Sequence, residues 1–243
     1  MDSGMGGISV LQSLIERMPE EFFVFWGDNK NAPYGTRDEA DILRLTWDIV
    51  YQLLARDVKA VVIACNTATA AAAADLRAKL KIPVLGLEPA LKPAALSARD
   101  GRIVVLATEA TIKLDKYHHL LERFGRNTVS LPCPELVEFV ERGDTDSDAL
   151  MDCLREKLNP EEGKIAAVVL GCTHYVWLRP AIEKVAPGAL IFDGNDGLAR
   201  HLREILESGG LLNEGGTGGY ELNTTSEDPA MLELMRRYLR QSI

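Results

Sequence analysis

Two cysteines occupy matching positions in the chain and are the residues best suited to chemistry. Cys65 follows the apolar run 60–64, and Cys172 follows the apolar run 166–170 with one glycine between. In an open parallel sheet, ligands bind beyond the carboxyl ends of the strands. A following helix start offers free N–H groups and a dipole that lower a thiol pKa from about 8.5. One thiolate can then accept a proton while the other thiol donates one, which predicts proton transfer on a small carboxylate substrate. A single buried cysteine would more simply be a core residue, but the matched pair favours function.

The residues next to the two cysteines are polar. Asn66, Thr67 and Thr173 have donors that could hold a substrate carboxylate, although these residue types also cap helices routinely. His174 could tune the nearby thiol or relay its proton. We therefore predict a polar pocket around each thiol.

A glycine-rich turn, residues 2–7, begins the chain. Asp2 could orient Cys65 or accept a substrate ammonium, and an ordinary turn aspartate is an equally good interpretation. In a βαβ fold such a turn follows a strand, but only Met1 precedes it. The strand that would carry the turn is therefore expected to be absent from this sequence. The glycines match neither GxGxxG nor a P-loop, so nucleotide binding is unsupported.

Two further segments could contribute to a site. The polar loop 27–35 is long enough to wrap a ligand, with backbone near Gly35 available for a carboxylate; a plain surface loop is the alternative. Thr108 and Thr111 could cap a helix or reach the site. Other reactive side chains are expected to have no chemical role: a solvated carboxylate at Glu141 and structural thiols at Cys133 and Cys153.

Short apolar segments alternate with amphipathic ones along the chain. Strands are predicted at 22–26, 60–64, 84–85, 103–107, 166–170, 189–192 and 220–223. Helices are predicted at 8–17, 37–55, 67–80, 111–124, 146–158, 178–185, 198–206 and 229–239. This alternation predicts an α/β fold of two similar lobes, each with a mainly parallel sheet flanked by helices. The first lobe is expected at 1–96 plus 208–243 and the second at 97–207, with a boundary near 96–101.

Composition excludes several classes of protein. The 243 residues carry a net charge of −9 without a basic stripe, which argues against a nucleic-acid partner. No apolar run approaches the roughly 18 residues of a membrane span, and no leader is visible. The 4 cysteines show no CxxC pairing, so neither zinc nor a disulfide framework is expected. A cytoplasmic protein with reduced thiols is predicted.

Several segments together resemble the aspartate/glutamate racemase family, and within it the glutamate racemases. The matching segments, in chain order, are Asp2-Ser3-Gly4-Met5-Gly6-Gly7, Pro33-Tyr34-Gly35, Ala64-Cys65-Asn66-Thr67-Ala68 and Gly171-Cys172-Thr173-His174-Tyr175. The resemblance covers nearly the whole chain, and the two cysteine motifs together are highly specific.

The resemblance implies a site between two lobes and racemisation of glutamate without pyridoxal phosphate, metal or other cofactor. It implies that Cys65, assisted by Asp2, acts on the D-enantiomer, and that Cys172, assisted by His174, acts on the L-enantiomer. The residues implied to hold the substrate are Ser3, Pro33, Tyr34, Gly35, Asn66, Thr67, Thr111 and Thr173, with Asp2 and His174. Aspartate racemases tend to have Glu where His174 stands, which favours glutamate. The family role is to supply D-glutamate for peptidoglycan, and a homodimer is the expected assembly.

Three other functions remain open from the residues alone. A racemase of aspartate or another small amino acid would prefer a different substrate, and a single-cysteine decarboxylase would tolerate the loss of one thiol. A non-catalytic protein that binds a small anion would need neither thiol.

Overall fold

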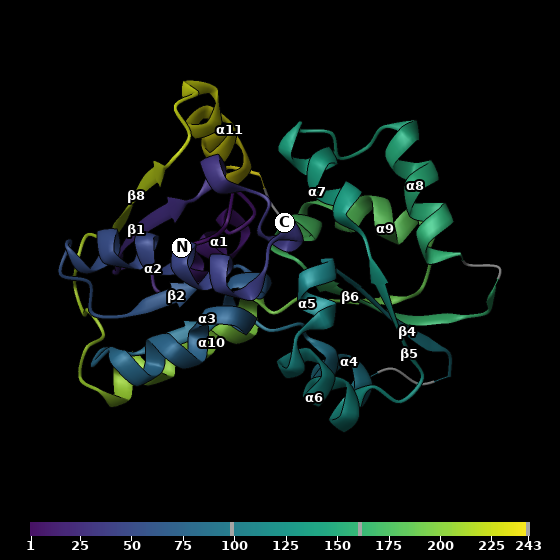
Figure 1. Cartoon of the computed structure of the whole chain (residues 1–243), viewed down its shortest axis with the longest axis horizontal. Helices are drawn as coiled ribbons and strands as arrows, with labels where there is room; N and C mark the ends of the chain where they lie inside the picture. The colour runs from purple at the N-terminus through teal and green to yellow at the C-terminus, as the bar shows by residue number, and fades with distance from the viewer. Residues whose placement is uncertain (98–99, 160–161, 242–243) are drawn as a thin grey trace. The chain divides into compact units, whose positions relative to one another are not determined.

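The chain forms two compact α/β units in a computed structural model that describes residues 1–97, 100–159 and 162–241 (Figure 1). The first unit comprises Met1–Leu87 with Asn195–Ser242, and the second comprises Glu88–Gly194. These limits differ from the expected 1–96 plus 208–243 and 97–207. Residues 195–207 belong to the first unit because their helix packs against elements of that unit. Residues 98–99 of the expected boundary lie outside the described residues.

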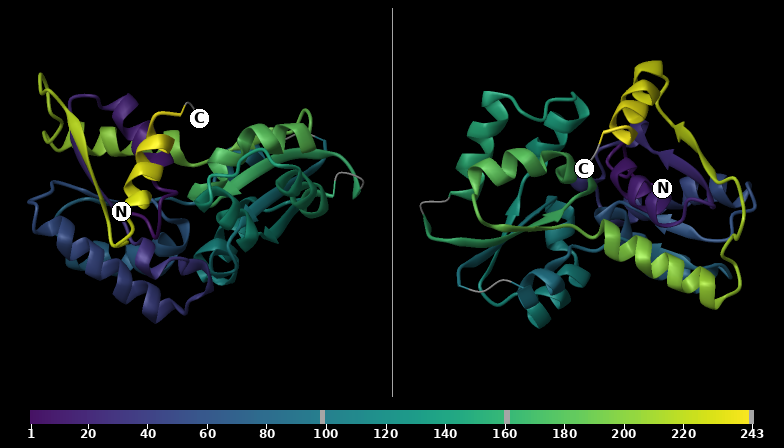
Figure 2. Two further views of the ribbon diagram at one scale, coloured as in Figure 1. Left: turned by 90° about the horizontal axis from the view of Figure 1, so that it is seen from above. Right: turned by 180° about the vertical axis from the view of Figure 1, so that it is seen from behind.

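The first unit contains two short parallel sheets. Strand β1 (Phe22–Gly27) pairs with β8 (Gly219–Thr224), and β2 (Val61–Ile63) pairs with β3 (Val84–Gly86). As predicted, the C-terminal strand returns to the first unit although it lies far away in sequence (Figure 2).

Met1 and Asp2 connect these two sheets by backbone hydrogen bonds. On the β1 side, the Asp2 amide donates to the Trp26 carbonyl at 2.9 Å, and the Asp2 carbonyl accepts from Asp28 at 3.0 Å. On the β2 side, the Met1 carbonyl accepts from Ala64 at 2.8 Å, and the terminal ammonium donates to the Val62 carbonyl at 2.7 Å. Met1 and Asp2 thus lie between β1 and β2, where a strand that carries the glycine-rich turn is expected.

Helices cover the strands of the first unit. They are α1 (Ile8–Arg17), α2 (Glu39–Leu54), α3 (Asn66–Lys79), α10 (Asn195–Ser208) and α11 (Pro229–Leu239), with short 3₁₀ helices η1 (Asn29–Asn31) and η2 (Tyr34–Thr36). Helix α1 packs against α10 and α11, and α2 packs against α3. The apolar faces of α1 and α10 pack with residues in or next to β2 and β3 to form a core cluster of Val10, Leu14, Met18, Ala64, Leu85, Leu87, Leu198, Ala199, Leu202 and Leu206.

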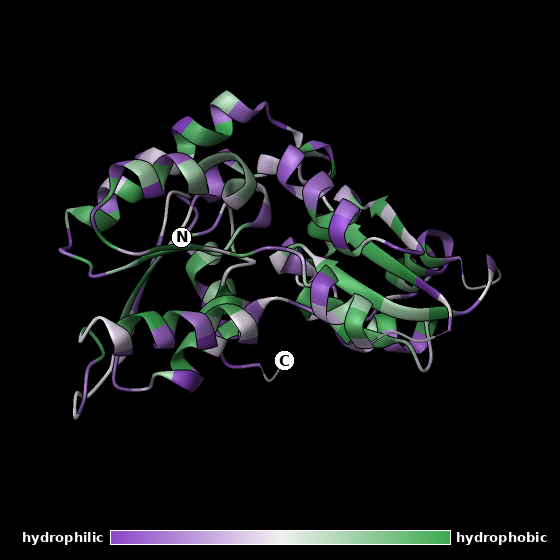
Figure 3. Cartoon of the chain, turned by 90° about the horizontal axis from the view of Figure 1, so that it is seen from below, coloured by the Kyte–Doolittle hydropathy of each residue, from purple (hydrophilic) through white to green (hydrophobic). Residues whose placement is uncertain are grey.

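The second unit is built on one four-stranded parallel sheet of order β5-β4-β6-β7. The strands are β4 (Arg102–Ala107), β5 (Thr128–Pro132), β6 (Ile165–Gly171) and β7 (Leu190–Phe192). Around them lie α4 (Leu91–Ser97), α5 (Glu109–Lys113), α6 (Asp115–Phe124), α7 (Pro134–Glu141), α8 (Asp148–Leu158), η4 (Thr173–Leu178) and α9 (Arg179–Val185). The central strands are almost wholly buried and apolar, whereas the helices have one polar face (Figure 3).

Two departures from the predicted elements have identifiable causes. Strand β5 lies at an edge and is only partly buried, so it lacks the continuous apolar run of a central strand. The helix expected at 111–124 is divided into α5 and α6 because Leu114 is extended, with φ −81° and ψ 140°. No helix among the described residues combines the length and apolar character needed to cross a membrane.

Candidate functional site

The thiol of Cys65 lies at the N-terminus of a regular helix. Cys65 follows β2 after one residue and is the N-cap of the 14-residue helix α3. Its Sγ accepts from the Ala68 amide at 3.4 Å and from the Ser3 hydroxyl at 3.3 Å. Two donors and the helix dipole stabilise negative charge on this sulfur. The strand-end position predicted for Cys65 is confirmed.

Charged and polar groups surround this thiol. The Asp2 side chain is fully buried, and its Oδ2 accepts from the Gly4 amide at 2.9 Å. Burial lowers the pKa of the Met1 ammonium to about 6, against the opposing influence of Asp2 and Cys65. Burial, together with the hydrogen bond to Asp28 and the charges of Cys65 and Asp2, raises the pKa of Tyr34 far above its ordinary value. Tyr34 is therefore a neutral hydroxyl at physiological pH. We call Asp2, Ser3, Tyr34, Cys65 and Asn66 the Cys65 cluster.

The Asn66 carboxamide is buried without a protein partner. Asn66 is 4% exposed, and neither Oδ1 nor Nδ2 has a hydrogen-bond partner among the described residues. The expectation that Asn66 caps the helix is wrong, because Cys65 is the cap and Asn66 lies in the first turn. An unpaired buried amide costs about 1–3 kcal/mol. A bound ligand with donors and acceptors would recover that cost. Thr67, beside it, is also buried.

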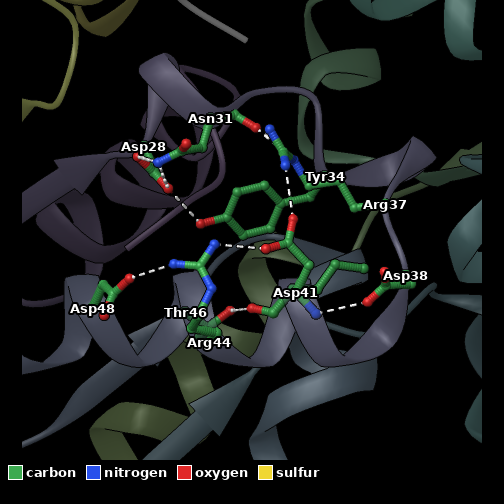
Figure 4. A network of polar contacts seen from close by, with 10 residues as sticks. Asp28, Asn31, Tyr34, Arg37, Asp38, Asp41, Arg44, Thr46 and Asp48 are labelled. Carbon is green, nitrogen blue, oxygen red and sulfur yellow. Dashed lines mark hydrogen bonds and ion pairs between the residues drawn. The ribbon is translucent and has the colours of Figure 1, made fainter.

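The loop 27–35 is folded around a buried carboxylate rather than being a plain surface loop (Figure 4). Asp28 is 1% exposed and accepts from the Tyr34 hydroxyl at 2.7 Å, the Asn31 amide at 3.0 Å and the Thr225 hydroxyl at 2.7 Å. This network buries Tyr34 and fixes the loop to the end of β8. Pro33 is exposed and Gly35 is half-buried. Sequence analysis missed Asp28, although its place directly after a strand was the available signal.

A short 3₁₀ helix follows Cys172. Cys172 is 8% exposed and comes directly after β6, as predicted. The next element, η4, is a 3₁₀ helix of 6 residues, and Cys172 makes no side-chain cap. The expected α-helix N-terminus at this thiol is therefore wrong, as is the capping role of Thr173, which lies inside η4. The polar group beside this sulfur comes instead from a histidine, which in turn pairs with a carboxylate.

His174 links Cys172 to Glu141. Its Nδ1 lies 3.6 Å from the Cys172 Sγ, and its Nε2 lies 2.7 Å from Glu141 Oε1. The expectation that Glu141 is only a solvated carboxylate is wrong, because its side chain is 24% exposed and paired with a buried imidazole. Sequence analysis missed this contact because 33 residues separate the two. We call Cys172, His174 and Glu141 the Cys172 cluster.

The Cys172 cluster favours a positive imidazole. Burial by itself lowers the pKa of His174, but the hydrogen bonds with Cys172 and Glu141 outweigh it and hold the pKa well above its usual value. An ionised carboxylate can only accept, so Nε2 carries a hydrogen toward Glu141. The protonated ring then donates from Nδ1 toward the sulfur, which stabilises a thiolate.

Strands β4, β5 and β6 finish at the same end of the second sheet. Ala107 pairs with Gly171 and with Pro132, so the residues that follow β4, β5 and β6 lie together. Thr108 caps α5 through the Thr111 amide at 3.2 Å, and the two buried hydroxyls lie 2.9 Å apart. The capping role expected for Thr108 is thus confirmed.

Cys133 also follows a strand of this sheet directly, since β5 ends at Pro132. Burial raises its pKa to about 12, so it remains a neutral thiol. Cys153 is partly exposed and lies near Glu135. No group of three or more His, Cys, Asp or Glu side chains suited to a metal ion occurs within residues 1–97, 100–159 and 162–241.

Comparison with known proteins identifies the class to which this fold and these clusters belong. The profile of the Asp/Glu/Hydantoin racemase family matches residues 6–202. The chain belongs to this racemase family.

Individual relatives narrow the comparison. The chain is 41% identical to glutamate racemase of Clostridium perfringens, covering 98% of this chain and 94% of that protein. It is similar, with TM-score 0.87 and 32% identity, to the crystal structure of Escherichia coli glutamate racemase with L-glutamate and the activator UDP-MurNAc-Ala, covering 98% of this chain and 92% of that one. A Francisella tularensis glutamate racemase structure with D-glutamate gives TM-score 0.85 at 27% identity, covering 100% and 93%.

Proposed function

We propose that this chain interconverts L- and D-glutamate by a two-cysteine acid–base mechanism. The observation that carries the proposal is a pair of buried thiols, each within two residues of the end of a strand and each with its own polar cluster. The relatives named above are glutamate racemases, which supports glutamate as the substrate.

The reaction needs one base and one acid for the same carbon. Starting from L-glutamate, the Cys172 thiolate takes the Cα proton and becomes a thiol. The electron pair of the broken C–H bond stays on the substrate and spreads into its carboxylate. The Cys65 thiol then delivers its proton to the opposite face of Cα and is left as a thiolate. The reverse sequence converts D-glutamate, so no atom or electron is gained or lost.

The polar residues around the thiols have distinct proposed roles. Asp2 and His174 assist Cys65 and Cys172 respectively, and Glu141 holds His174 in its charged form. The residues proposed to bind the substrate are Ser3, Pro33, Tyr34, Gly35, Asn66, Thr67, Thr111 and Thr173. Developing charge on the substrate carboxylate must be met by preplaced donors because no delocalising group is covalently attached to it. The unpaired Asn66 amide is one such donor.

The proposed setting follows from the proposed reaction. We place the protein in the cytoplasm as a homodimer, where it supplies D-glutamate for peptidoglycan. Because the chain carries a net charge of −9, its overall field does not attract an anionic substrate. Local donors in the two clusters supply the attraction.

An isotope experiment tests the mechanism. The protein is incubated with L-glutamate in D₂O, and both enantiomers are analysed early in the reaction. A two-base enzyme gives D-glutamate that carries deuterium at Cα, while recovered L-glutamate carries little. Equal deuterium in both enantiomers would indicate a single base, and no exchange at all would contradict the proposal.

Cysteine variants distinguish the alternatives. Cys65→Ser and Cys172→Ser should each lower racemisation by at least about 10²-fold, as expected for a general acid–base group. The matched control is Cys153→Ser, since this thiol is partly exposed and outside both clusters. Decarboxylase activity that survives the loss of one thiol would favour a single-cysteine decarboxylase. Faster turnover of aspartate would favour the alternative substrate, and binding without turnover would favour an anion-binding protein.

A further inference from the structure

Tyr175 is a buried residue of η4 that takes no direct part in the proposed proton transfers. Its side chain is 0% exposed, and it comes directly after His174 in the chain. Its hydroxyl donates to the Cys133 carbonyl at 2.6 Å. Because Cys133 is the N-cap of α7, this hydrogen bond joins η4 to the beginning of that helix.

The other end of α7 contacts the same 3₁₀ helix. Glu141 is the last residue of α7 and pairs with the His174 Nε2 at 2.7 Å. Consecutive residues of η4 therefore hold the two ends of α7, which at about 1.5 Å per residue are about 12 Å apart in a helix of 8 residues. A helix held at both ends can neither slide nor turn about one contact, so the position of Glu141 is fixed against η4.

The hydroxyl bond is additional to the bonds of the helix itself. The Cys133 carbonyl also accepts from the Leu136 amide at 3.2 Å. A carbonyl oxygen has two lone pairs, so it can serve the helix and Tyr175 together. This carbonyl would keep a partner if the hydroxyl were removed, and the effect of the bond is therefore on the placement of α7. The alternative is that a buried tyrosine hydroxyl simply requires an acceptor, as Tyr117 has in Ser130.

The C-terminal end of α7 determines the charge of His174. Within the described residues, the titratable groups that contact the imidazole are Cys172 and Glu141. The C-terminal end of a helix also carries partial negative charge, which favours a nearby cation. A displacement of Glu141 by about 1 Å would take its contact with the imidazole outside the normal range of a hydrogen bond. The imidazolium therefore depends on where α7 lies.

We propose that Tyr175 is a positioning residue: by holding the N-terminal end of α7 against η4, it keeps Glu141 in hydrogen-bonding contact with His174. The proposal rests on the proposed function for its effect on racemisation, whereas the contact itself is independent of what the chain catalyses. Burial and the charge of Cys172 raise the pKa of Tyr175 well above its ordinary value. The hydroxyl thus remains a donor over the whole pH range of the tests below.

An NMR titration of the His174 imidazole in the full chain, without substrate, tests the positioning directly. In Tyr175→Phe we expect proton binding to His174 to weaken by about tenfold or more, because a looser contact with Glu141 removes part of what raises its pKa. Tyr117→Phe is the matched control, since it removes another buried hydroxyl bond from the same unit. The control should titrate as wild type. A titration of Tyr175→Phe equal to that of wild type or of the control would overturn the proposal.

Kinetics provide a second measurement on the same variant. The kcat for glutamate should fall by about tenfold with little change in KM, because the hydroxyl is bonded to α7 and acts on the acid–base group alone. The alkaline limb of the pH profile should move to lower pH, since the imidazolium loses its proton sooner. A fall in kcat without movement of this limb would show a purely structural role and overturn the proposal. If the chain does not racemise glutamate, the kinetic arm fails while the NMR titration still decides the role of Tyr175.

A double-mutant cycle tests whether Tyr175 acts through Glu141. In a Glu141→Gln background the carboxylate that α7 positions is absent. Tyr175→Phe should then change proton binding to His174 by less than about twofold, compared with about tenfold in the wild-type background. Equal effects in the two backgrounds would mean that Tyr175 acts by another route and would contradict the proposal.

A conservative replacement separates the donor from the ring. Tyr175→p-aminophenylalanine keeps an N–H donor at the same place, so proton binding to His174 should lie between that of wild type and that of Tyr175→Phe. If Tyr175→Phe does not fold, this variant takes its place in the cycle. Weaker proton binding in the wild-type background alone is then the expected result, and an equal change in both backgrounds would overturn the proposal.

Discussion

The hydrogen bond between Glu141 and His174 determines the charge that faces Cys172. The imidazole is buried, and its pKa stays high only because Cys172 and Glu141 offset the cost of burial. In Glu141→Gln we expect the pKa of His174 to fall and turnover of L-glutamate to decrease on the order of 10- to 100-fold, somewhat below the full effect of an acid–base group. NMR titration of the imidazole and steady-state kinetics measure the two effects. Glu138→Gln, an exposed position on the same helix, is the control. An unchanged imidazole titration would contradict this account.

The same contact predicts a pH dependence of stability. Because the pKa of His174 in the folded protein lies above the ordinary value of 6.5, the proton binds more tightly to the folded state. The resulting stabilisation is complete below pH 6.5 and is lost as the pH rises through the elevated folded-state pKa. The free energy of unfolding of wild type relative to His174→Gln should therefore be most favourable near or below pH 6.5 and should decline at higher pH. Urea unfolding across this range measures it, and a difference that grows with pH would contradict the assignment.

The unpaired carboxamide of Asn66 predicts opposite effects on stability and binding. Asn66→Leu removes a buried polar group without a partner, so the free energy of unfolding should stay unchanged or rise by about 1 kcal/mol. If the amide binds substrate, KM for glutamate should rise about tenfold, which corresponds to about 1.4 kcal/mol. Thr69→Val is the matched control on the same helix. Its hydroxyl donates to the Ile63 carbonyl at 3.1 Å, so its loss should lower stability and leave KM unchanged. Destabilisation by Asn66→Leu with unchanged KM would show a structural role instead.

At the scale of elements, the close approach of α3 to β3 holds Cys65 in place. A Cβ at Gly86 would lie 2.3 Å from Thr69 Cγ2, so helix and strand must separate in Gly86→Ala. We expect a loss of about 1–3 kcal/mol in the free energy of unfolding. Turnover should also fall, because Thr69 lies one turn beyond Cys65. Adding Thr69→Ala should restore part of the stability and part of the turnover. The atom then nearest to the new Cβ at position 86 is the Cβ of residue 69, at 3.1 Å. Strictly additive effects in the double variant would contradict the contact.

A second glycine provides the control for this comparison. A Cβ at Gly197 meets nothing within 4 Å, and Gly197 lies inside α10. Gly197→Ala should therefore stabilise the protein by about 0.5–1 kcal/mol through helix propensity. Thermal unfolding measures both glycine variants, and loss of stability in Gly197→Ala would contradict the open space assigned there.

Helices and strands whose apolar residues recur with a clear periodicity were predictable from the sequence. Helices α1 and α11 lie at 8–17 and 229–239 as predicted, and both cysteines lie beyond buried strands. What escaped prediction depends on tertiary contacts. The partly exposed edge strand β5 lacks the apolar run of a buried strand, and the 3₁₀ geometry after Cys172 has no local signal. The pairing of His174 with Glu141 joins positions distant in sequence, so periodicity could not reveal it.

At the scale of the whole chain, the two units differ in how completely their sheets are paired. In the second unit β4 is paired on both sides, with β5 and with β6. Among the described residues of the first unit, β1 and β2 each have a continuous strand partner on one side only, and both line a cavity. Unpaired edges and empty space reduce the number of interactions lost on opening. The first unit should therefore open locally at lower free energy.

Hydrogen exchange of the whole protein tests this difference. Amides of β1 and β2 should exchange at least about tenfold faster than those of β4 and β6, because sub-global opening exposes the less completely paired sheets first. Two-state unfolding is also not expected of two separate cores, so calorimetry should show a broadened transition or two transitions. Equal protection of all four strands would mean that the cavity between β1 and β2 does not weaken the first unit.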